Sequence, residues 1–520
     1  MSLWSVFRSL TCVALAAYPV VAQQAAPATG TTRLVLDAGA GRDTISRHIY
    51  GQFAEHLGRL IYDGTWSRTS ASAPWHMRAD VVQALKKIQV PNIRWPGGCF
   101  ADTYHWRDGV GPAAQRPSIV NTNWGGVTED NGVGTHEILA LARELGAEPY
   151  IVGNIGSGTV QEMHDWWEYV NHPGVSPMAD LRRKNGQEAP FNVRFWGMGN
   201  EAWGCGGNMR PEYYADELKR YATYLPGYGG VRPYRIAVGP ADGDYNWTEV
   251  VMREAGGMID GLDLHHYTIA GTWATKGHAT GFSEGQWFSA MRGAVAIDEM
   301  IRRHAAIMDK YDQRKRVALI VGEWGMWHDQ EPGSHPGFLY QQNTMRDALV
   351  AAASLDIFNK HADRVRGANI AQMVNVLQAM ILTDGNRMLL TPTYHVFEMY
   401  TVHHDAVMLP IAVSSQGWYT LGADSVRAVS ASASRDKNGV MHVTMSNLDP
   451  THPRSVAVDL KTTRVTSAVG RILVGDTMDA FNTFEAPERV TPAPFTGARV
   501  ADGQLTVTLP AHSVVVLELK

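Results

Sequence analysis

Two glutamates occupy matching contexts in this 520-residue sequence. Glu201 follows the apolar run 193–196 through a short glycine-containing segment, and Glu323 follows the apolar run 317–321 and one glycine. Each run is typical of a buried strand. In a (β/α)8 barrel, residues at the carboxyl ends of the strands form the floor of the active site. Two carboxylates delivered there from different strands are what glycoside hydrolysis requires, one to protonate the leaving oxygen and one to meet the oxocarbenium-like centre.

The elements that would position these glutamates form a repeating pattern. Between residues 49 and 399, short apolar runs alternate with helix-like segments, as in βα units around a parallel sheet. Amphipathic helices are predicted over 80–88, with Asp80 as N-cap, and over 135–146 and 340–361. About eight strands can be counted, enough to close a barrel in which Glu201 ends the fourth and Glu323 the seventh. They are 49–53, 92–95, 149–153, 193–196, 235–239, 261–265, 317–321 and 368–372.

The pattern changes near residue 400. Strand-like runs of period two, separated by turn sequences, continue to residue 520 and predict a C-terminal β-sandwich of jelly-roll-like form. The segment 33–48 begins with another strand pattern, and we expect this N-terminal strand to join the sandwich. The predicted fold class is therefore α/β, a (β/α)8 TIM barrel at 49–399 followed by a β-sandwich at 400–520.

The composition indicates a globular protein that does not bind nucleic acid. A hydrophobic content of 45% and a charged content of 19% suit a globular core. The net charge is −5 and there is no basic run, so a nucleic-acid partner is not expected.

The N-terminus has the pattern of a secretory signal. Arg8 precedes a short, mostly apolar stretch at 9–21, and Val20-Val21-Ala22 is an acceptable cleavage site. We therefore expect a signal peptide at 1–22, a flexible lead-in at 23–32, and an exported enzyme, periplasmic or extracellular, with no membrane contact in its mature form. An uncleaved anchor is the alternative, but the stretch is short for a bilayer span.

Three cysteines are too few for a disulfide framework. Cys12 would leave with the signal peptide. Cys99 and Cys205 both fall in candidate active-site loops, where a single bridge is conceivable. Two buried free thiols are the preferred interpretation.

At this point the motifs resemble those of the α-L-arabinofuranosidases of glycoside hydrolase family 51. The resemblance covers nearly the whole chain after the N-terminal segment. It rests on Glu55-His56-Leu57-Gly58-Arg59-Leu60-Ile61-Tyr62-Asp63-Gly64, Ile93-Arg94-Trp95-Pro96-Gly97-Gly98, Trp196-Gly197-Met198-Gly199-Asn200-Glu201-Ala202-Trp203-Gly204, Leu264-His265-His266-Tyr267, Gly322-Glu323-Trp324 and Ala371-Gln372-Met373-Val374-Asn375.

The resemblance implies a role for each of several residues. Glu201 would be the general acid and then the general base, and Glu323 the nucleophile of a retaining mechanism, with their carboxyl groups about 5–5.5 Å apart. Asn200 would bond the sugar 2-hydroxyl, although an asparagine there could instead form a turn. Tyr267 would donate to Glu323, the alternative being a packed core tyrosine. The other implied roles are sugar binding for Glu55 and Gln372, and support of the carboxylates for Arg94 and His265.

Other positions complete the expected site. A buried Glu55 must meet either the ligand or a cation such as Arg94. Many family members carry asparagine where this chain has Cys99, so the sugar contact there would be weaker or different. Trp203 and Trp327 follow the two glutamates and are expected to be platforms for the leaving-group sugar. No metal is expected, because the adjacent pairs His265-His266 and His403-His404 lack the spacing of a zinc site.

The sequence thus predicts a retaining exo-glycosidase, without a cofactor, that releases terminal α-L-arabinofuranose from arabinose-containing plant polysaccharides and oligosaccharides. An endo-β-glucanase or xylanase on the same framework is the alternative enzyme. A catalytically silent carbohydrate-binding protein is the alternative from another class. Family members are often homo-oligomers, and the sequence leaves the oligomeric state open.

Overall fold

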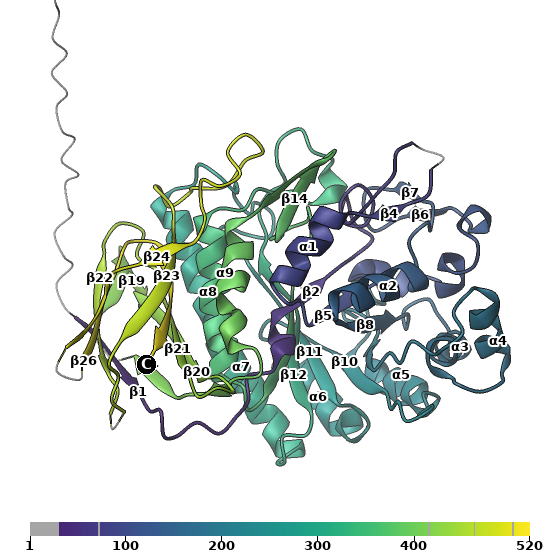
Figure 1. The fold of residues 1–520 in the computed structure, drawn as a ribbon. Coiled ribbons are helices and arrows are strands. Elements are labelled where there is room, and N and C mark those ends of the chain that lie inside the picture. The colour runs from purple at the N-terminus through teal and green to yellow at the C-terminus, as the bar shows by residue number, and fades with distance from the viewer. Residues whose placement is uncertain (1–30, 71–72, 414–416, 462, 502–503) are drawn as a thin grey trace, which may run out of the picture.

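A computed structural model of the chain describes residues 31–520 except 71–72, 414–416, 462 and 502–503 (Figure 1). The predicted leader at 1–22 lies outside the described residues, as does the lead-in up to residue 30.

Eight parallel strands close into a barrel in the hydrogen-bonded order β10-β11-β12-β13-β2-β5-β8-β9, which confirms the predicted fold class. Successive side chains of a strand point to opposite faces, so Asn92 and Arg94 of β5 both face the barrel interior. Asn92 accepts a hydrogen bond from Asn369 on β13, and Arg94 donates to Glu323 on β12. The barrel strands are β2 Gly51–Phe53, β5 Asn92–Trp95, β8 Glu148–Gly153, β9 Phe195–Met198, β10 Tyr234–Ala241, β11 Gly261–Thr268, β12 Ala318–Met326 and β13 Val365–Ile370.

Helices surround the barrel (Figure 1). They are α1 Ala79–Lys87, α2 Thr135–Leu145, α3 Val160–Asn171, α4 Pro177–Lys184, α5 Pro211–Thr223, α6 Tyr245–Ala255, α7 Glu284–Tyr311, α8 Met345–Lys360 and α9 Pro392–Tyr400. The expected N-cap at Asp80 is wrong, because Asp80 lies in the first turn of α1 and pairs with Arg78. The predicted start of α8 at 340 is also wrong. The hydroxyl of Thr344 accepts from the Arg346 N–H and the carboxylate of Asp347 accepts from the Thr344 N–H, so this capping box sets the start at Met345.

The C-terminal part is built from two sheets that enclose a second hydrophobic core. One sheet has the order β17-β1-β22-β26-β25 and the other β16-β20-β21-β27-β23-β24. The first strand of the described chain, β1, pairs in parallel with β22, as the purple strand among the yellow ones shows (Figure 1). The strands are β1 Thr32–Leu36, β16 Val407–Met408, β17 Ile411–Val413, β20 Val429–Arg435, β21 Met441–Asn447, β22 Arg454–Asp459, β23 Ala468–Val474, β24 Ala493–Phe495, β25 Ala498–Ala501, β26 Gln504–Leu509 and β27 Ser513–Leu519.

Helix α8 joins the barrel to this sandwich, since it packs against both β12 and β20. Its buried Asp356 accepts hydrogen bonds from the hydroxyls of Ser430, Ser432 and Thr444 on the sandwich. These bonds satisfy a buried carboxylate and fix the sandwich against the barrel.

Small two-stranded sheets lie outside the barrel and the two sandwich sheets. They are β3 Trp66–Ser67 with β4 His76–Met77, β6 Ile119–Asn121 with β7 Val127–Glu129, β14 Ile381–Asp384 with β15 Arg387–Leu390, and β18 Trp418–Leu421 with β19 Asp424–Arg427.

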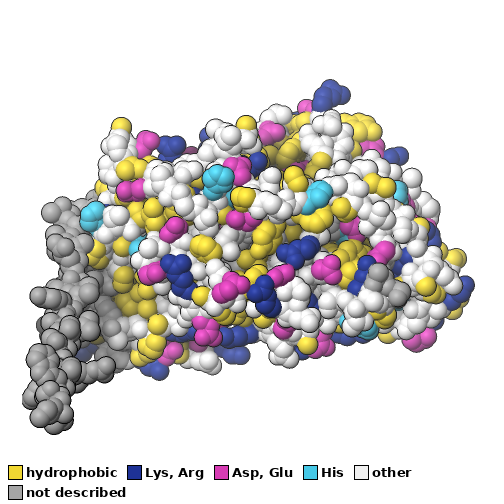
Figure 2. All heavy atoms as spheres, turned by 90° about the horizontal axis from the view of Figure 1, so that it is seen from above, with side chains coloured by type: hydrophobic (Ala, Val, Ile, Leu, Met, Phe, Trp, Pro, Cys, Tyr) yellow, Lys and Arg dark blue, Asp and Glu magenta, His cyan; other side chains and the backbone are white. Residues whose placement is uncertain are grey.

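Acidic and basic side chains are interspersed on the face seen in Figure 2, with hydrophobic groups scattered between them. This distribution agrees with the small net charge of the chain. Among the described residues, none of the helices combines the length and the apolar character that crossing a bilayer requires.

Candidate active site

The two predicted catalytic glutamates meet at one end of the barrel. Glu201 follows β9, and Glu323 lies inside β12, which continues to Met326 rather than ending at the glutamate. One carboxylate oxygen of each residue, together with a ring nitrogen of His265, forms a group whose atoms all lie within 4.8 Å of one another. This separation suits the retaining geometry of about 5–5.5 Å and is too small for the water of an inverting enzyme. Glu201 has a φ of 38°, in the left-handed region that non-glycine residues seldom adopt.

Arg94 is the buried cation beside Glu323 and Asn200. Its guanidinium is fully buried and donates to Glu323 Oε1 at 2.9 Å and to Asn200 Oδ1 at 2.6 Å. The Asn200 amide nitrogen is thereby turned away from Arg94, and the Asn200 backbone N–H donates to Asp102 at 2.7 Å. Asn200 is therefore locked in one orientation, as a residue that bonds a sugar hydroxyl must be.

His265 lies between the two glutamates. Its Nδ1 is 2.9 Å from Glu201 Oε1 and 3.7 Å from Glu323 Oε1, while its Nε2 is 3.3 Å from Asp263 Oδ2. Burial disfavours the charged ring, but the carboxylates of Glu323, Asp263 and Glu201 together raise the pKa of His265 to about 10. At neutral pH the ring is an imidazolium that donates on both sides, so it stabilises negative charge and cannot act as a base.

Asp263 was missed by the sequence reasoning. It accepts a hydrogen bond from the Gly322 N–H and one from the Tyr150 hydroxyl, and it lies 3.7 Å from Arg94. The sequence could have indicated a place for Asp263 in the site, because Asp263 lies two residues before His265 and alternate residues of a strand share a face. Asp263 therefore belongs with Arg94 among the groups that orient the catalytic carboxylates.

Tyr267 donates from its hydroxyl to Glu323 Oε2 at 2.8 Å. Burial raises the pKa of Glu323, and the positive charges of His265 and Arg94 together with the Tyr267 hydrogen bond oppose this rise. These three partners favour the ionised carboxylate, which is the form that a nucleophile needs.

Glu55 forms a second buried carboxylate beside the pair, but Arg94 is not its partner. Its Oε1 accepts from the N–H groups of Gly98 and Phe100 and from Trp124 Nε1, and its Oε2 accepts from Gln372 Nε2 at 3.1 Å. Of the two partners expected for Glu55, the ligand or a cation, the cation is absent among the described residues, and four neutral donors bind the carboxylate. Burial and the neighbouring charge of Glu323 raise the pKa of Glu55 to about 7 despite these bonds. Trp124 lies in the turn between β6 and β7, and nothing in the sequence around it indicated a contact with Glu55.

A Glu55→Gln variant should lose less stability than the wild type as pH rises from about 5 to 7. The pKa of Glu55 is about 7 in the folded state and 4.5 in the unfolded chain, so wild-type stability falls as pH rises through this window. At about 1.4 kcal/mol per pH unit, the loss amounts to about 3 kcal/mol in the free energy of unfolding. Glutamine does not titrate. Its amide can bond Gln372, whose Oε1 has no partner among the described residues.

Denaturant unfolding at pH 5 and pH 8 measures this difference. The exposed Glu188 provides a matched control, and Glu188→Gln should keep the wild-type dependence. Parallel pH dependences in the wild type and Glu55→Gln would show that Glu55 is ionised in both states.

The backbone at Gly98 passes so close to two carboxylates that only glycine fits there. A Cβ atom at Gly98 would lie 2.9 Å from Glu323 Oε1 and 3.4 Å from Glu55 Oε1. No side chain fits between these oxygens, so the Pro96-Gly97-Gly98 motif lets the β5 loop approach both carboxylates.

Cys99 and Cys205 form a disulfide, so the expectation of two buried free thiols is wrong. The loop after β5 and the loop after β9 come together at the rim of the site, and there the two cysteines are partly or fully exposed rather than buried. Cys205 Sγ lies 3.6 Å from Glu201 Oε2. The bridge therefore borders Glu201, and the sulfur of Cys99, without a proton, is only a weak acceptor.

Aromatic rings form one wall of the rim. Trp327 packs edge-to-face against Tyr267 and against Trp273, which is 57% exposed. Trp203 lies on the other loop and donates from Nε1 to the Gly239 carbonyl. Both predicted platform residues are half-buried, with the exposed Trp273 extending the wall formed by Trp327.

Within the described part of the chain, two groups of side chains have the spacing of metal ligands: Cys99, Glu201 and Cys205, and Glu201, His265 and Glu323. Neither has suitable donors. The two cysteines of the first group are joined in a disulfide. In the second group, the neighbouring carboxylates raise the pKa of His265 to about 10, which favours the protonated ring over the neutral ring that a metal needs.

A barrel that presents two carboxylates from its fourth and seventh strands at retaining distance defines a glycoside hydrolase. Comparison with known families narrows this class. Residues 84–238 match the model of the "Alpha-L-arabinofuranosidase 1 domain", and residues 322–513 that of the "Alpha-L-arabinofuranosidase C-terminal domain".

Similar proteins agree with these matches. The chain is 49% identical to an "Intracellular exo-alpha-L-arabinofuranosidase" of Bacteroides ovatus over 94% of this chain and 95% of the relative. The structure of a GH51 arabinofuranosidase from Xanthomonas axonopodis pv. citri matches with 49% identity and a TM-score of 0.92, covering 94% of this chain and 100% of that one. An arabinose complex of an α-L-arabinofuranosidase from Thermotoga maritima matches with 32% identity and a TM-score of 0.80, covering 94% and 99%. The chain belongs to the α-L-arabinofuranosidases of glycoside hydrolase family 51.

The exported location predicted from the N-terminus is contradicted by these relatives. The Bacteroides ovatus protein and similar proteins of Streptomyces lividans and Bifidobacterium longum are all named intracellular. The apolar stretch at 9–21 is short and follows a single basic residue, so its composition alone was a weak basis for a signal peptide.

Proposed function

We propose that this enzyme releases terminal, non-reducing α-L-arabinofuranosyl residues from arabinose-containing polysaccharides and oligosaccharides by double displacement, with Glu323 as nucleophile and Glu201 as acid and base. The observation that carries this assignment is the close approach of the two carboxylates, from β12 and from the end of β9.

In the first step, Glu323 attacks the anomeric carbon and forms an ester bond as the glycosidic bond breaks. Glu201 transfers its proton to the departing oxygen, so the leaving group departs as a neutral alcohol. Arg94 and Tyr267 keep Glu323 ionised and aimed, because each donates to a different oxygen of its carboxylate. His265 stabilises the negative charge that Glu201 acquires when it gives up its proton.

In the second step, Glu201 takes a proton from water, and the water oxygen attacks the anomeric carbon. The ester bond to Glu323 breaks and the arabinose leaves with its original configuration. The imidazolium of His265 remains within reach of both carboxylates through the cycle, so the site never holds two adjacent uncompensated negative charges.

Substrate binding is assigned to the polar groups around the pair. Asn200, Glu55 and Gln372 are positioned to bond the hydroxyls of the arabinose ring, with the Cys99–Cys205 disulfide at its edge. Trp203 and Trp327 would stack on the leaving-group sugar. We assign catalysis to residues 49–399 and expect the sandwich at 400–520 to have a structural role, as the bonds of Asp356 across the contact support.

A panel of four substrates tests the activity: aryl α-L-arabinofuranoside, aryl β-D-xyloside, aryl β-D-glucoside and a cello-oligosaccharide. Selective cleavage of the arabinofuranoside is expected. Cleavage of the cello-oligosaccharide alone would favour the endo-glucanase alternative, and inactivity on all four would favour a silent binding protein.

Size-exclusion chromatography with light scattering on the same preparation would decide whether the enzyme is a homo-oligomer.

A further inference from the structure

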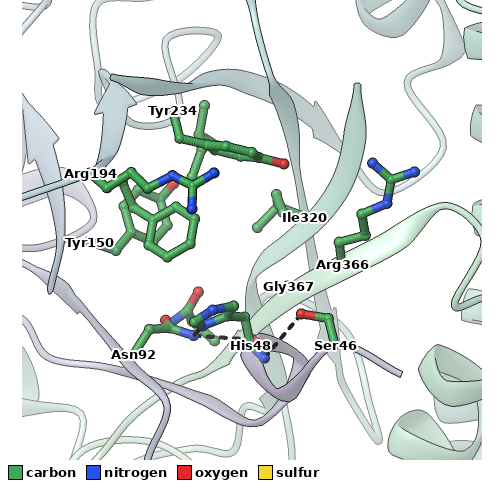
Figure 3. Close-up of a pocket in the computed structure, with 12 residues that line it drawn as sticks. Ser46, His48, Asn92, Tyr150, Arg194, Tyr234, Ile320, Arg366 and Gly367 are labelled. Atoms are coloured by element: carbon green, nitrogen blue, oxygen red, sulfur yellow. Dashed lines mark hydrogen bonds between the residues drawn. The ribbon is translucent and has the colours of Figure 1, made fainter. Parts of the chain in front are cut away.

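A cavity of about 210 Å³ is lined by the residues drawn in Figure 3. These residues lie near the amino ends of the barrel strands, whereas Glu201 and Glu323 lie toward the carboxyl ends. Its lining comes from the first residues of the barrel strands, including Asn92 of β5, Phe195 of β9 and Tyr234 of β10. Ser46 and His48 close one side, just before β2. A dry cavity of about 150 Å³ can hold benzene, so this cavity has room for one six-membered ring and a small substituent.

The walls of the cavity are mainly apolar. Phe195, Ile236 and Ile320 line it together with the rings of Tyr150 and Tyr234. Apolar and aromatic surfaces of this kind favour a ligand with an apolar body over a free sugar.

Positive charge is present without a matching carboxylate. Arg194 and Arg366 lie on opposite sides of the cavity (Figure 3). Arg366 is held by the carbonyls of Arg316 and Lys315. The Arg194 guanidinium lies over the rings of Phe195 and Tyr234, 5.9 Å and 5.7 Å from their centroids. Among the described residues it has no carboxylate partner, and the Tyr234 hydroxyl makes no hydrogen bond.

The two acidic groups near the cavity already have partners. Asp260 pairs with Arg232 at 3.3 Å and lies 3.7 Å from Arg316, and Glu148 lies 3.8 Å from the His48 ring. Burial lowers the pKa of His48 to about 4, so its ring is neutral at pH 7 and can accept as well as donate a hydrogen bond. At the Tyr234 hydroxyl, the positive charges of Arg366, Arg194 and Arg316 act against the negative charge of Asp260.

We propose that this cavity binds a small organic acid with one apolar ring, an arylcarboxylate in chemical class. The carboxylate would accept from the Arg194 guanidinium and the Tyr234 hydroxyl, and the ring would pack against Phe195, Ile236 and Ile320. This site is distinct from the catalytic cleft. Tyr150 separates the two, since its ring lines the cavity while its hydroxyl donates to Asp263 on the catalytic side.

Isothermal titration of the full-length enzyme tests the proposal, with benzoate as probe, benzamide as its neutral isostere and inorganic phosphate as an anion without a ring. Benzoate should bind at least about tenfold more tightly than benzamide, because the charge-assisted bond to Arg194 is lost with the neutral amide. Arg194→Met should weaken benzoate binding by a similar factor, and Tyr234→Phe by a few-fold. Arg143→Met, which removes an exposed charge at the end of α2 and outside the cavity, is the control and should bind as the wild type does.

Several results would overturn the proposal: no heat of binding with benzoate, equal affinity of the wild type and Arg194→Met, or phosphate binding as tightly as benzoate. Displacement of benzoate by L-arabinose would place the ligand in the catalytic cleft and would also refute it. Arg194 is exposed, so its variant should fold, and an unchanged melting temperature without ligand would establish this.

Discussion

Replacing Glu323 by alanine should lower kcat on both aryl and natural arabinofuranosides by a factor on the order of 10⁵–10⁶, the effect seen when a covalent nucleophile is removed. No other described carboxylate takes its place. Glu55 is held by four neutral donors, and Asp263 accepts from the Gly322 N–H on the far side of Arg94. The loss should therefore not depend on the leaving group. Initial rates with an activated aryl substrate and an arabino-oligosaccharide measure it.

The variant should still fold. Arg94 keeps its bond to Asn200 and remains 3.7 Å from Asp263, so its buried charge is not left alone. Azide provides a positive control, since it can enter the vacated space and attack the anomeric carbon directly. The product would be the glycosyl azide of inverted configuration. Unchanged turnover without azide would assign the nucleophile to another residue.

The barrel could be predicted because its strands are continuous apolar runs of the kind that burial on both faces demands. The order of the strands then placed Glu201 and Glu323 at one end, since the carboxyl ends of parallel strands meet there. Arg94, His265 and Tyr267 followed from the motifs, and the structure brings all three into contact with the catalytic pair.

Other features depend on contacts between segments far apart in the chain. Trp124 donates to Glu55 from a hairpin 69 residues away. Neither residue type indicates in the sequence that the two side chains will meet. The Cys99–Cys205 bridge spans 106 residues and depends on two loops meeting above the barrel. Glu55 was expected to meet either the ligand or a cation such as Arg94, but Arg94 donates to Glu323 and Asn200, and neutral donors bind Glu55 instead.

A Glu201→Ala variant should distinguish the acid from the nucleophile through the choice of leaving group. On natural substrates, whose leaving alcohol needs a proton, kcat should fall about 10²–10⁴-fold. With an activated aryl arabinofuranoside the first step needs no acid, so Glu323 should still be glycosylated. Water is then no longer deprotonated, and the glycosyl-enzyme should accumulate after a burst of released aryl alcohol.

The geometry around Glu201 supports this selective defect. Removing its carboxylate leaves His265 bound to Asp263 at 3.3 Å and near Glu323 at 3.7 Å, so the imidazolium keeps its partners and the nucleophile keeps Arg94 and Tyr267. Azide should restore turnover here too, because it attacks the intermediate without losing a proton. The product would now be the azide of retained configuration, opposite to that of Glu323→Ala. Equal losses with both leaving groups, or identical azide products from the two variants, would mean that the two roles are wrongly divided between these glutamates.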